Sequence, residues 1–260
     1  MNLHANLTAL YNETAADDPY HLAAGALLRN LPAIADRTAA EAADICHVSK
    51  STLERLVHRL GYDGFVSFRG DAARIVAKFG LFNRVLPEAP GRGDRETADA
   101  YFAEVQATLD AQRSALDFAE VRRVVEALRT ARRVVFYTMG RSFAESALQF
   151  TLAMAGKDAQ VVSRYTDQLA DAQRLDAGCV AFVETTDFMS TFDMAPVFEA
   201  ARRGGAKTVL LTLTAASQYA DLADLRLASR QTDTMVGDYG LQWAIDVVHL
   251  VFRREAIDRR

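Results

Sequence analysis

Between Glu41 and Gly61, apolar residues recur every three or four positions along the chain. They are Ala42, Ala43, Ile45 and Val48 in the first half of this segment and Leu53, Leu56, Val57 and Leu60 in the second half. This spacing places the apolar side chains on one face of a helix, where they can join a core. The pattern predicts two short helices joined by a tight turn, with Ser49 capping the second helix at its N-terminus and Gly61 ending it.

The opposite face of the second predicted helix carries cations and hydroxyl groups. Such side chains contact phosphates and base edges when a recognition helix lies in the major groove of DNA. We therefore predict double-stranded DNA as a partner. The predicted DNA-binding residues are Ser49, Lys50, Ser51, Thr52, Arg55, His58 and Arg59. The alternative interpretation is an ordinary amphipathic hairpin whose basic face is simply solvated.

Composition and charge are compatible with a DNA-binding protein. The chain has 260 residues, of which 50% are hydrophobic, so it can build one or two domains with a sizeable core. Its formal net charge of −4 is unfavourable for binding DNA as a whole, but residues 49–84 hold seven cations and three anions, a local charge of +4. A local basic patch is what attracts DNA.

Cysteine use and hydropathy indicate the compartment. Cys46 and Cys179 lie in segments expected to be buried, which fits a reducing environment better than a disulfide framework. Two cysteines so placed build no metal cluster, and no metal or cofactor is predicted. With no signal peptide and no apolar run long enough to span a bilayer, we expect a soluble cytoplasmic protein.

Two prolines and two glycines between Leu86 and Thr97 interrupt the helical pattern. We interpret residues 86–97 as a linker between a first domain, residues 1–85, and a second, residues 98–260. Residues 97–129 are again expected to be helical. From Arg132 onward, short apolar segments alternate with helical ones, which is typical of a parallel sheet covered on both faces. The expected strands are residues 134–137, 159–162, 180–183, 208–213 and 225–228, and the expected helices are residues 143–155, 191–203 and 240–257.

The segment from Val48 to Arg69 resembles the N-terminal domain of RpiR/MurR-type bacterial transcriptional regulators, with its Val-Ser-x-x-Thr turn and a Leu-Gly-Tyr-x-Gly-Phe sequence after the recognition helix. In the second half of the chain, the loops after the first and third strands, together with residues 211–227, resemble the sugar isomerase (SIS) domain. In the family this domain follows the N-terminal DNA-binding domain. The resemblance implies an α/β fold with an all-α N-terminal domain: a helical helix-turn-helix domain and then a doubly wound parallel-sheet, SIS-like domain.

The same resemblance implies a small-molecule effector, either a sugar phosphate or a carboxylated or neutral metabolite. The residues it indicates for effector binding are Thr138, Gly140, Arg141, Ser142, Thr185, Thr186 and Thr191. The second loop departs from the family pattern, because Phe188 and Met189 replace a Ser-Gly pair that lets backbone amides close on a phosphate. A dimerisation module that has lost its effector is therefore a second reading of this domain.

An enzyme of the SIS class is a further alternative, because aldose–ketose isomerisation needs a base beside the sugar. His249 lies in an apolar helix and reads as a packing residue, while Glu145 and Glu184 are closer to the candidate loops. The attached DNA reader favours sensing over conversion, so no catalytic residue is predicted. The strongly apolar C-terminal helix predicts a homodimer or a tetramer.

Overall fold

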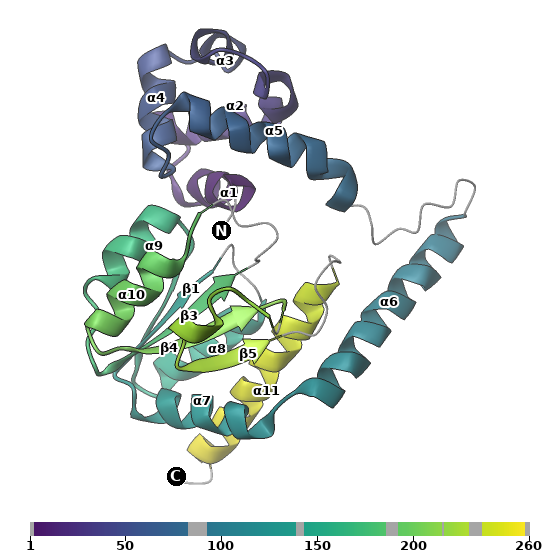
Figure 1. The fold of residues 1–260 in the computed structure, drawn as a ribbon, viewed down its shortest axis with the longest axis vertical. Coiled ribbons are helices and arrows are strands. Elements are labelled where there is room, and N and C mark those ends of the chain that lie inside the picture. Colours follow the sequence, from purple (N-terminus) through teal and green to yellow (C-terminus); the bar gives the residue numbers. More distant parts are fainter. Residues whose placement is uncertain are drawn as a thin grey trace.

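The computed structural model describes residues 3–82, 93–138, 143–185, 192–214, 216–228 and 236–257. The first of these ranges forms a helical domain (Figure 1). It contains α1 (Leu3–Glu13), α2 (Pro19–Ile34), α3 (Ala39–Ile45), α4 (Lys50–Arg59) and α5 (Phe65–Phe82). Helices α3 and α4 are the two halves of the predicted helix-turn-helix. The sequence pattern before Glu41 led to no prediction of α1 or α2.

Local capping groups explain where these helices begin. The Asp18 carboxylate accepts a hydrogen bond from the Tyr20 backbone N–H at the start of α2. Thr38 and Glu41 form a reciprocal capping box at the start of α3. Ser49 caps α4 as predicted, since its hydroxyl accepts a hydrogen bond from the Thr52 N–H at 3.1 Å.

Two helices, α6 (Asp94–Ala115) and α7 (Phe118–Thr130), follow the helical domain. The sequence predicted one helical stretch here, but Leu116 is extended and the Asp117 side chain starts a new helix by accepting from the Ala119 N–H. Because α6 begins at Asp94, the last residues of the predicted linker are helical, whereas residues 83–92 lie outside the described part of the chain. The division into domains stays a prediction.

The remainder is an α/β domain around a parallel sheet in the order β2-β1-β3-β4-β5. Its strands are β1 (Arg133–Tyr137), β2 (Asp158–Val162), β3 (Cys179–Thr185), β4 (Lys207–Thr212) and β5 (Leu225–Ala228), each within two residues of its predicted bounds. The helices are α8 (Phe143–Met154), α9 (Tyr165–Ala172), α10 (Ala195–Arg203) and α11 (Gly237–Ile257), with a short 3-10 turn, η2 (Ala220–Leu222). The sequence missed α9, and α10 starts four residues later than expected.

Side chains alternate between the two faces of the sheet. Val134, Phe136 and Phe182 pack against α7, α8 and α11, whereas Tyr137 and Val183 pack toward α9 and α10. The apolar core on the α9 and α10 face continues into the helical domain. One apolar cluster therefore contains residues of helices α1 through α5 and of this face of the sheet. Figure 1 shows the helical domain seated beyond one end of the strands, with α1 nearest to the sheet.

Candidate functional site

The candidate recognition helix α4 has a buried face and an exposed face. Leu53, Leu56 and Val57 are fully buried. The predicted DNA-binding residues on the other side differ in their exposure: Ser49, Lys50, Ser51, Arg55 and His58 are exposed, whereas Thr52 and Arg59 are half-buried. The amphipathic pattern therefore leaves a polar face exposed on a helix, the element that the major groove of DNA can accommodate.

Two of these polar side chains are held by weak interactions that a phosphate can replace. The Lys50 ammonium lies 3.7 Å from the Glu54 carboxylate, an exposed pair that water and salt screen strongly. The Arg55 Nε donates to the Ser51 carbonyl at 3.2 Å, which leaves its terminal nitrogens for other partners.

Two other predicted contacts are already engaged within the domain. The Arg59 guanidinium lies 4.6 Å from the centroid of the Tyr20 ring, a cation–π contact that fastens α4 to α2. The His58 Nδ1 is 2.9 Å from the Tyr62 carbonyl. Arg59 is thus a packing residue as well as a candidate DNA contact, which a helical pattern alone does not reveal.

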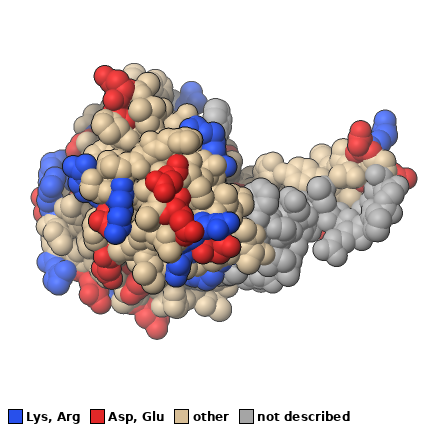
Figure 2. Space-filling view, turned by 90° about the horizontal axis from the view of Figure 1, so that it is seen from above, with Lys and Arg blue, Asp and Glu red and all other residues tan. Residues whose placement is uncertain are grey.

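Positive and negative side chains are mixed on the surface of the helical domain. Figure 2 looks down onto this domain and shows Lys and Arg interspersed with Asp and Glu, without one continuous basic face. This face therefore offers DNA separate cations rather than one broad positive field.

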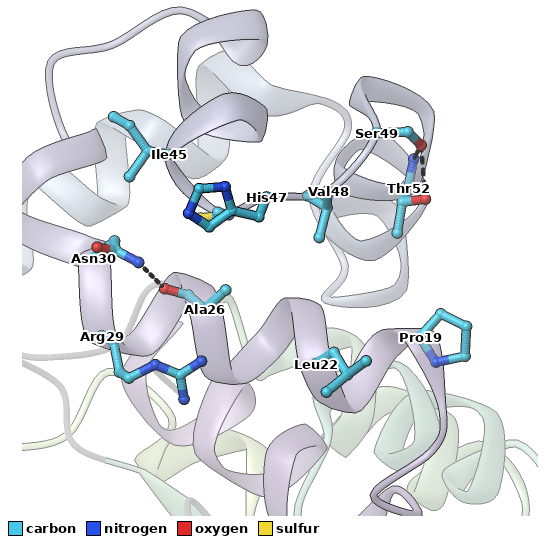
Figure 3. Close-up of a pocket in the computed structure, with 11 residues that line it drawn as sticks. Pro19, Leu22, Ala26, Arg29, Asn30, Ile45, His47, Val48, Ser49 and Thr52 are labelled. Carbon is cyan, nitrogen blue, oxygen red and sulfur yellow. Dashed lines mark hydrogen bonds between the residues drawn. The ribbon is translucent and has the colours of Figure 1, made fainter.

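A hollow of about 540 Å³ lies between α2 and the turn that leads into α4 (Figure 3). Its lining combines apolar and polar side chains: Pro19, Leu22, Ala26, Arg29, Asn30, Ile45, Cys46, His47, Val48, Ser49 and Thr52. His47 adopts a left-handed backbone conformation, with φ 55°, where the turn reverses direction. The hollow therefore flanks the N-terminus of α4, an end of a helix that favours anions.

The chain leaves α4 through a turn that also meets the second domain. Gly61 has a φ of 93°, which ends the helix as predicted. Tyr62, Phe65 and Phe68 are buried beneath α4, also as predicted. The Tyr62 ring lies 5.1 Å from the ring of Phe192, and Phe192 stacks on Tyr165 at 4.7 Å. This aromatic contact joins the end of α4 to the segment just before α10.

Hydrogen bonds and an ion pair join the domains beside these rings. The Tyr165 backbone N–H, at the start of α9, donates to the Asn6 Oδ1 of α1 at 3.1 Å. The Arg164 Nε is 3.6 Å from the Glu13 carboxylate. The helical domain therefore rests on the first turn of α9, which lies at the carboxyl end of β2.

The predicted effector residues gather at this edge of the sheet as far as they are described. Thr138 follows β1 and Thr185 ends β3, and both side chains are buried. From β1 the chain crosses to β2 on one side, and it then returns to β3 on the other, so β1 and β3 flank a topological switch point, where ligands of such sheets bind. Gly140, Arg141, Ser142, Thr186 and Thr191, together with Phe188 and Met189, lie outside the described residues.

Buried side chains that the sequence did not single out support this edge. The Gln168 Nε2 donates to the Thr138 carbonyl at 3.0 Å and to the Val162 carbonyl at 2.8 Å, which ties α9 to the ends of β1 and β2. Asn6 and Gln168 are both almost fully buried. Neither belongs to a motif, and a polar residue within a short amphipathic helix gives no signal of burial, so only the tertiary structure identifies them.

The side chains considered for catalysis lie in different places. The His249 Nε2 is 2.7 Å from the Thr151 hydroxyl, between α11 and α8, and burial lowers the pKa of this imidazole. Figure 1 shows α11 ending near the edge of the sheet opposite to the helical domain. Glu145, in the first turn of α8, is buried, and Glu184 is half-buried next to the end of β3.

The described ranges show neither a cluster of metal ligands nor a membrane-spanning helix. These residues contain no group of three or more His, Cys, Asp or Glu side chains arranged to hold a metal ion. Within the same ranges, no helix is long and apolar enough to cross a bilayer. Cys46 and Cys179 are buried free thiols, and burial raises the pKa of each.

Comparison with known proteins shows similarity of fold. No protein-family model matches the sequence, and no curated protein matches it either. The NanR protein of Vibrio vulnificus, solved in complex with ManNAc-6P, is 18% identical, with a TM-score of 0.55 over 99% of this chain and 94% of its own. Phosphoheptose isomerase GmhA from Neisseria gonorrhoeae is 16% identical, with a TM-score of 0.50 over 62% of this chain and 98% of its own.

The sugar isomerase domain of an RpiR transcription factor from Sphaerobacter thermophilus is 19% identical, with a TM-score of 0.48 over 61% of this chain and 96% of its own. The match to NanR extends over both parts of the chain, whereas the match to GmhA covers a little under two thirds of it. The chain thus shares the fold of NanR in both of its parts, the helical domain that contains α3 and α4 and the parallel-sheet domain. This is the architecture that the resemblance to RpiR/MurR-type regulators implied.

Proposed function

We propose that this protein is a DNA-binding transcriptional regulator whose SIS-like domain binds a small metabolite. The observation that carries the proposal is one fold similarity that spans 99% of the chain and includes the helix-turn-helix. The exposed polar face of α4 supports DNA as the partner. In this proposal residues 1–85 read DNA, residues 86–97 link the domains, and residues 98–260 bind the effector and form a cytoplasmic homodimer or tetramer.

The proposed effector is a sugar phosphate or a related carbohydrate catabolite. NanR, the protein of similar fold, was solved with ManNAc-6P, a phosphorylated sugar. In this chain the ligand would lie at the switch point between β1 and β3, near Thr138 and Thr185 and the predicted residues Gly140, Arg141, Ser142, Thr186 and Thr191. The Phe188-Met189 pair favours a ligand with more apolar surface and less negative charge than the family's usual one.

The DNA-binding part is tested with the purified full-length protein. A two-fold dimer presents two recognition helices, so we expect footprinting to show a pseudo-palindromic site with half-sites about 10 bp apart, or a multiple of that distance. Arg55→Ala should weaken specific binding by about 1–3 kcal/mol. Arg122→Ala, an exposed arginine on α7, is the matched control and should leave the affinity unchanged. Binding that is purely salt-driven, with no protected site, would contradict the proposal.

The effector part is tested by isothermal titration against ManNAc-6P and a panel of hexose phosphates. A ligand that binds only the folded protein must also raise its apparent stability, so a thermal shift provides an independent readout. Ser142→Ala should weaken binding if the first loop contacts the ligand. A panel in which no compound binds or shifts the melting temperature would favour the reading in which the domain only dimerises.

A second candidate function is sugar-phosphate isomerisation, favoured by one observation: Glu145 and Glu184 flank the same carboxyl edge of the sheet. A carboxylate there is a possible base for moving a proton between adjacent carbons. Incubation of the protein with sugar phosphates in D₂O distinguishes the two functions, because an isomerase exchanges a carbon-bound proton with solvent. Binding without exchange is the result expected of a regulator.

A further inference from the structure

Three buried polar atoms near the switch point have hydrogen-bonding capacity that the protein does not use. Of the seven buried side-chain atoms without a hydrogen-bond partner among the described residues, three are Asn6 Nδ2, Gln168 Oε1 and Thr185 Oγ1. The three residues are 1%, 0% and 0% exposed. Buried polar groups are nearly always hydrogen-bonded, because an unpaired one costs about 1–3 kcal/mol. Unused groups gathered at one edge therefore indicate a site for something that binds there.

The other atoms of these side chains fix them at that edge. Asn6 is held through its Oδ1, which accepts from the Tyr165 N–H at 3.1 Å, and Gln168 through its Nε2, which donates to the carbonyls at the ends of β1 and β2. Thr185 is the last residue of β3, and strand alternation directs its side chain to the face of Ala181 and Val183, which is the face of α9 and α10. Each free atom thus belongs to a side chain that is already positioned.

Two of the three residues belong to the sheet domain, but Asn6 lies on α1 of the helical domain. The ion pair of Arg164 with Glu13 and the ring contact of Phe192 with Tyr62 hold this domain over the same edge. We propose that the effector site spans both domains, with Asn6 Nδ2 donating a hydrogen bond to the bound ligand while Gln168 Oε1 and Thr185 Oγ1 bind its hydroxyl groups. This inference rests on the proposed function and adds a contact from the helical domain.

The chemistry of the three atoms defines the part of the ligand that they bind. An amide N–H donates, an amide oxygen accepts, and a hydroxyl does both. A polyhydroxylated carbon chain, whose hydroxyls each donate and accept, satisfies all three atoms, whereas a phosphate or carboxylate group would oppose the Gln168 oxygen. The sugar part of the ligand therefore lies against α1, and its anionic end points elsewhere. Because Asn6 precedes the helix-turn-helix on the same domain, the ligand touches the DNA-reading domain directly.

The test compares binding of ManNAc-6P and glucose 6-phosphate to the full chain by isothermal titration. Asn6→Asp keeps an oxygen to accept from the Tyr165 N–H but loses the amide donor, so it should raise the Kd about fivefold to tenfold. Asn12→Asp, an exposed position on the same helix with the same change in charge, is the control and should leave the Kd unchanged.

Thr185→Val provides a second, neutral variant of nearly equal volume. Because the hydroxyl it removes is unpaired in the free protein, the melting temperature without ligand should rise, while the Kd should increase about fivefold to tenfold. Wild-type binding that neither Asn6→Asp nor Thr185→Val weakens would overturn this inference and leave the proposed function standing. Tighter binding by Asn6→Asp would show that the helical domain competes with the ligand, which also overturns it. If the wild type binds neither probe, the inference fails, whereas footprinting still decides the DNA-binding part of the proposed function.

Discussion

Tyr62, at the junction of the two domains, stabilises its own domain and also contacts the other one. Its hydroxyl donates to the Asp71 carboxylate at 2.9 Å, and both side chains are buried. Burial also raises the pKa of the Tyr62 phenol, so it remains a neutral donor throughout the physiological range. Tyr62 therefore fastens the turn after α4 to α5 while its ring contacts Phe192.

Removal of this hydroxyl leaves the buried Asp71 with one fewer donor. We expect Tyr62→Phe to lower the free energy of unfolding by about 1–2 kcal/mol. Urea denaturation measures the loss. Tyr101→Phe is a fitting control, because the Tyr101 hydroxyl is 2.9 Å from that of Tyr239 on an exposed surface and its removal should cost little. Equal effects of the two substitutions would show that burial of the Asp71 pair contributes nothing.

The His249 imidazole gives a prediction about pH. Burial, the largest effect, lowers the pKa of the imidazole in the folded protein below its ordinary value of 6.5, although Asp246 opposes that shift and Arg253 adds to it. The unfolded chain then binds the proton more tightly, so stability present above pH 6.5 is lost as the pH falls below it. We expect His249→Gln to reduce the fall in melting temperature between pH 7.5 and 5.5, and an unchanged slope would refute this assignment.

At the residue scale, the sequence predicted what depends on neighbours along the chain. The Ser49 cap and the Gly61 stop were predicted correctly because each acts within its own helix. The stacking of Arg59 on Tyr20 and the hydrogen bond of Asn6 to Tyr165 were not predicted, since their partners come from other elements. Tertiary contacts of this kind carry no periodic signal.

At the scale of elements, the central strands β1, β3 and β4 were predicted well because each is a short apolar run bounded by turns, and burial on both faces demands such runs. Helix α9 was missed because it has only eight residues and includes the buried polar Gln168, which breaks the amphipathic pattern. The boundary between α6 and α7 was also missed, since apolar spacing continues across Leu116 and Asp117. Element type is therefore more predictable than element ends.

The turn from α10 to β4 depends on a close approach that only glycine permits. A Cβ at Gly204 would lie 1.9 Å from the Leu175 carbonyl oxygen, a backbone atom that cannot move aside freely. We expect Gly204→Ala to destabilise the protein by about 1–3 kcal/mol through overpacking. Gly70→Ala is the contrasting variant, because a Cβ there meets nothing within 4 Å and alanine favours the helix α5 by about 0.5–1 kcal/mol. Chemical denaturation of both variants should give opposite signs.

At the scale of the whole molecule, the sequence indicated two successive folding units but not their contact. The apolar cluster that runs from α1 to α10 makes the helical domain part of the cover of the sheet, and Tyr62 with Phe192 lies inside it. The sequence pattern does not predict this contact between the domains, because each apolar residue in it is also what the core of its own domain requires. The order of domains was predictable from the chain, whereas the place where they meet was not.

The opposite side of the sheet domain presents apolar surface to solvent. Phe150 and Met154 on α8 and Leu250 on α11 are 68%, 67% and 65% exposed, and the bond between Thr151 and His249 shows that these two helices are neighbours. The buried stripe of α11, including Ile245 and Val248, faces its own domain. The apolar C-terminal helix thus has a second apolar side, which is exposed. A subunit interface at this helix stays a prediction.

A contiguous apolar patch on a folded protein usually marks a contact with another molecule. We expect a homodimer in which the α8 and α11 surfaces of two copies meet about a two-fold axis, since a self-complementary patch is the commonest way to close an assembly. Phe150→Glu combined with Leu250→Glu places charges in this interface and should yield a monomer in light scattering at micromolar concentration. Both side chains are exposed, so the monomer should remain folded. Phe118→Glu, at an exposed phenylalanine on α7, should keep the wild-type mass, and a wild-type protein that is itself monomeric would rule out the interface.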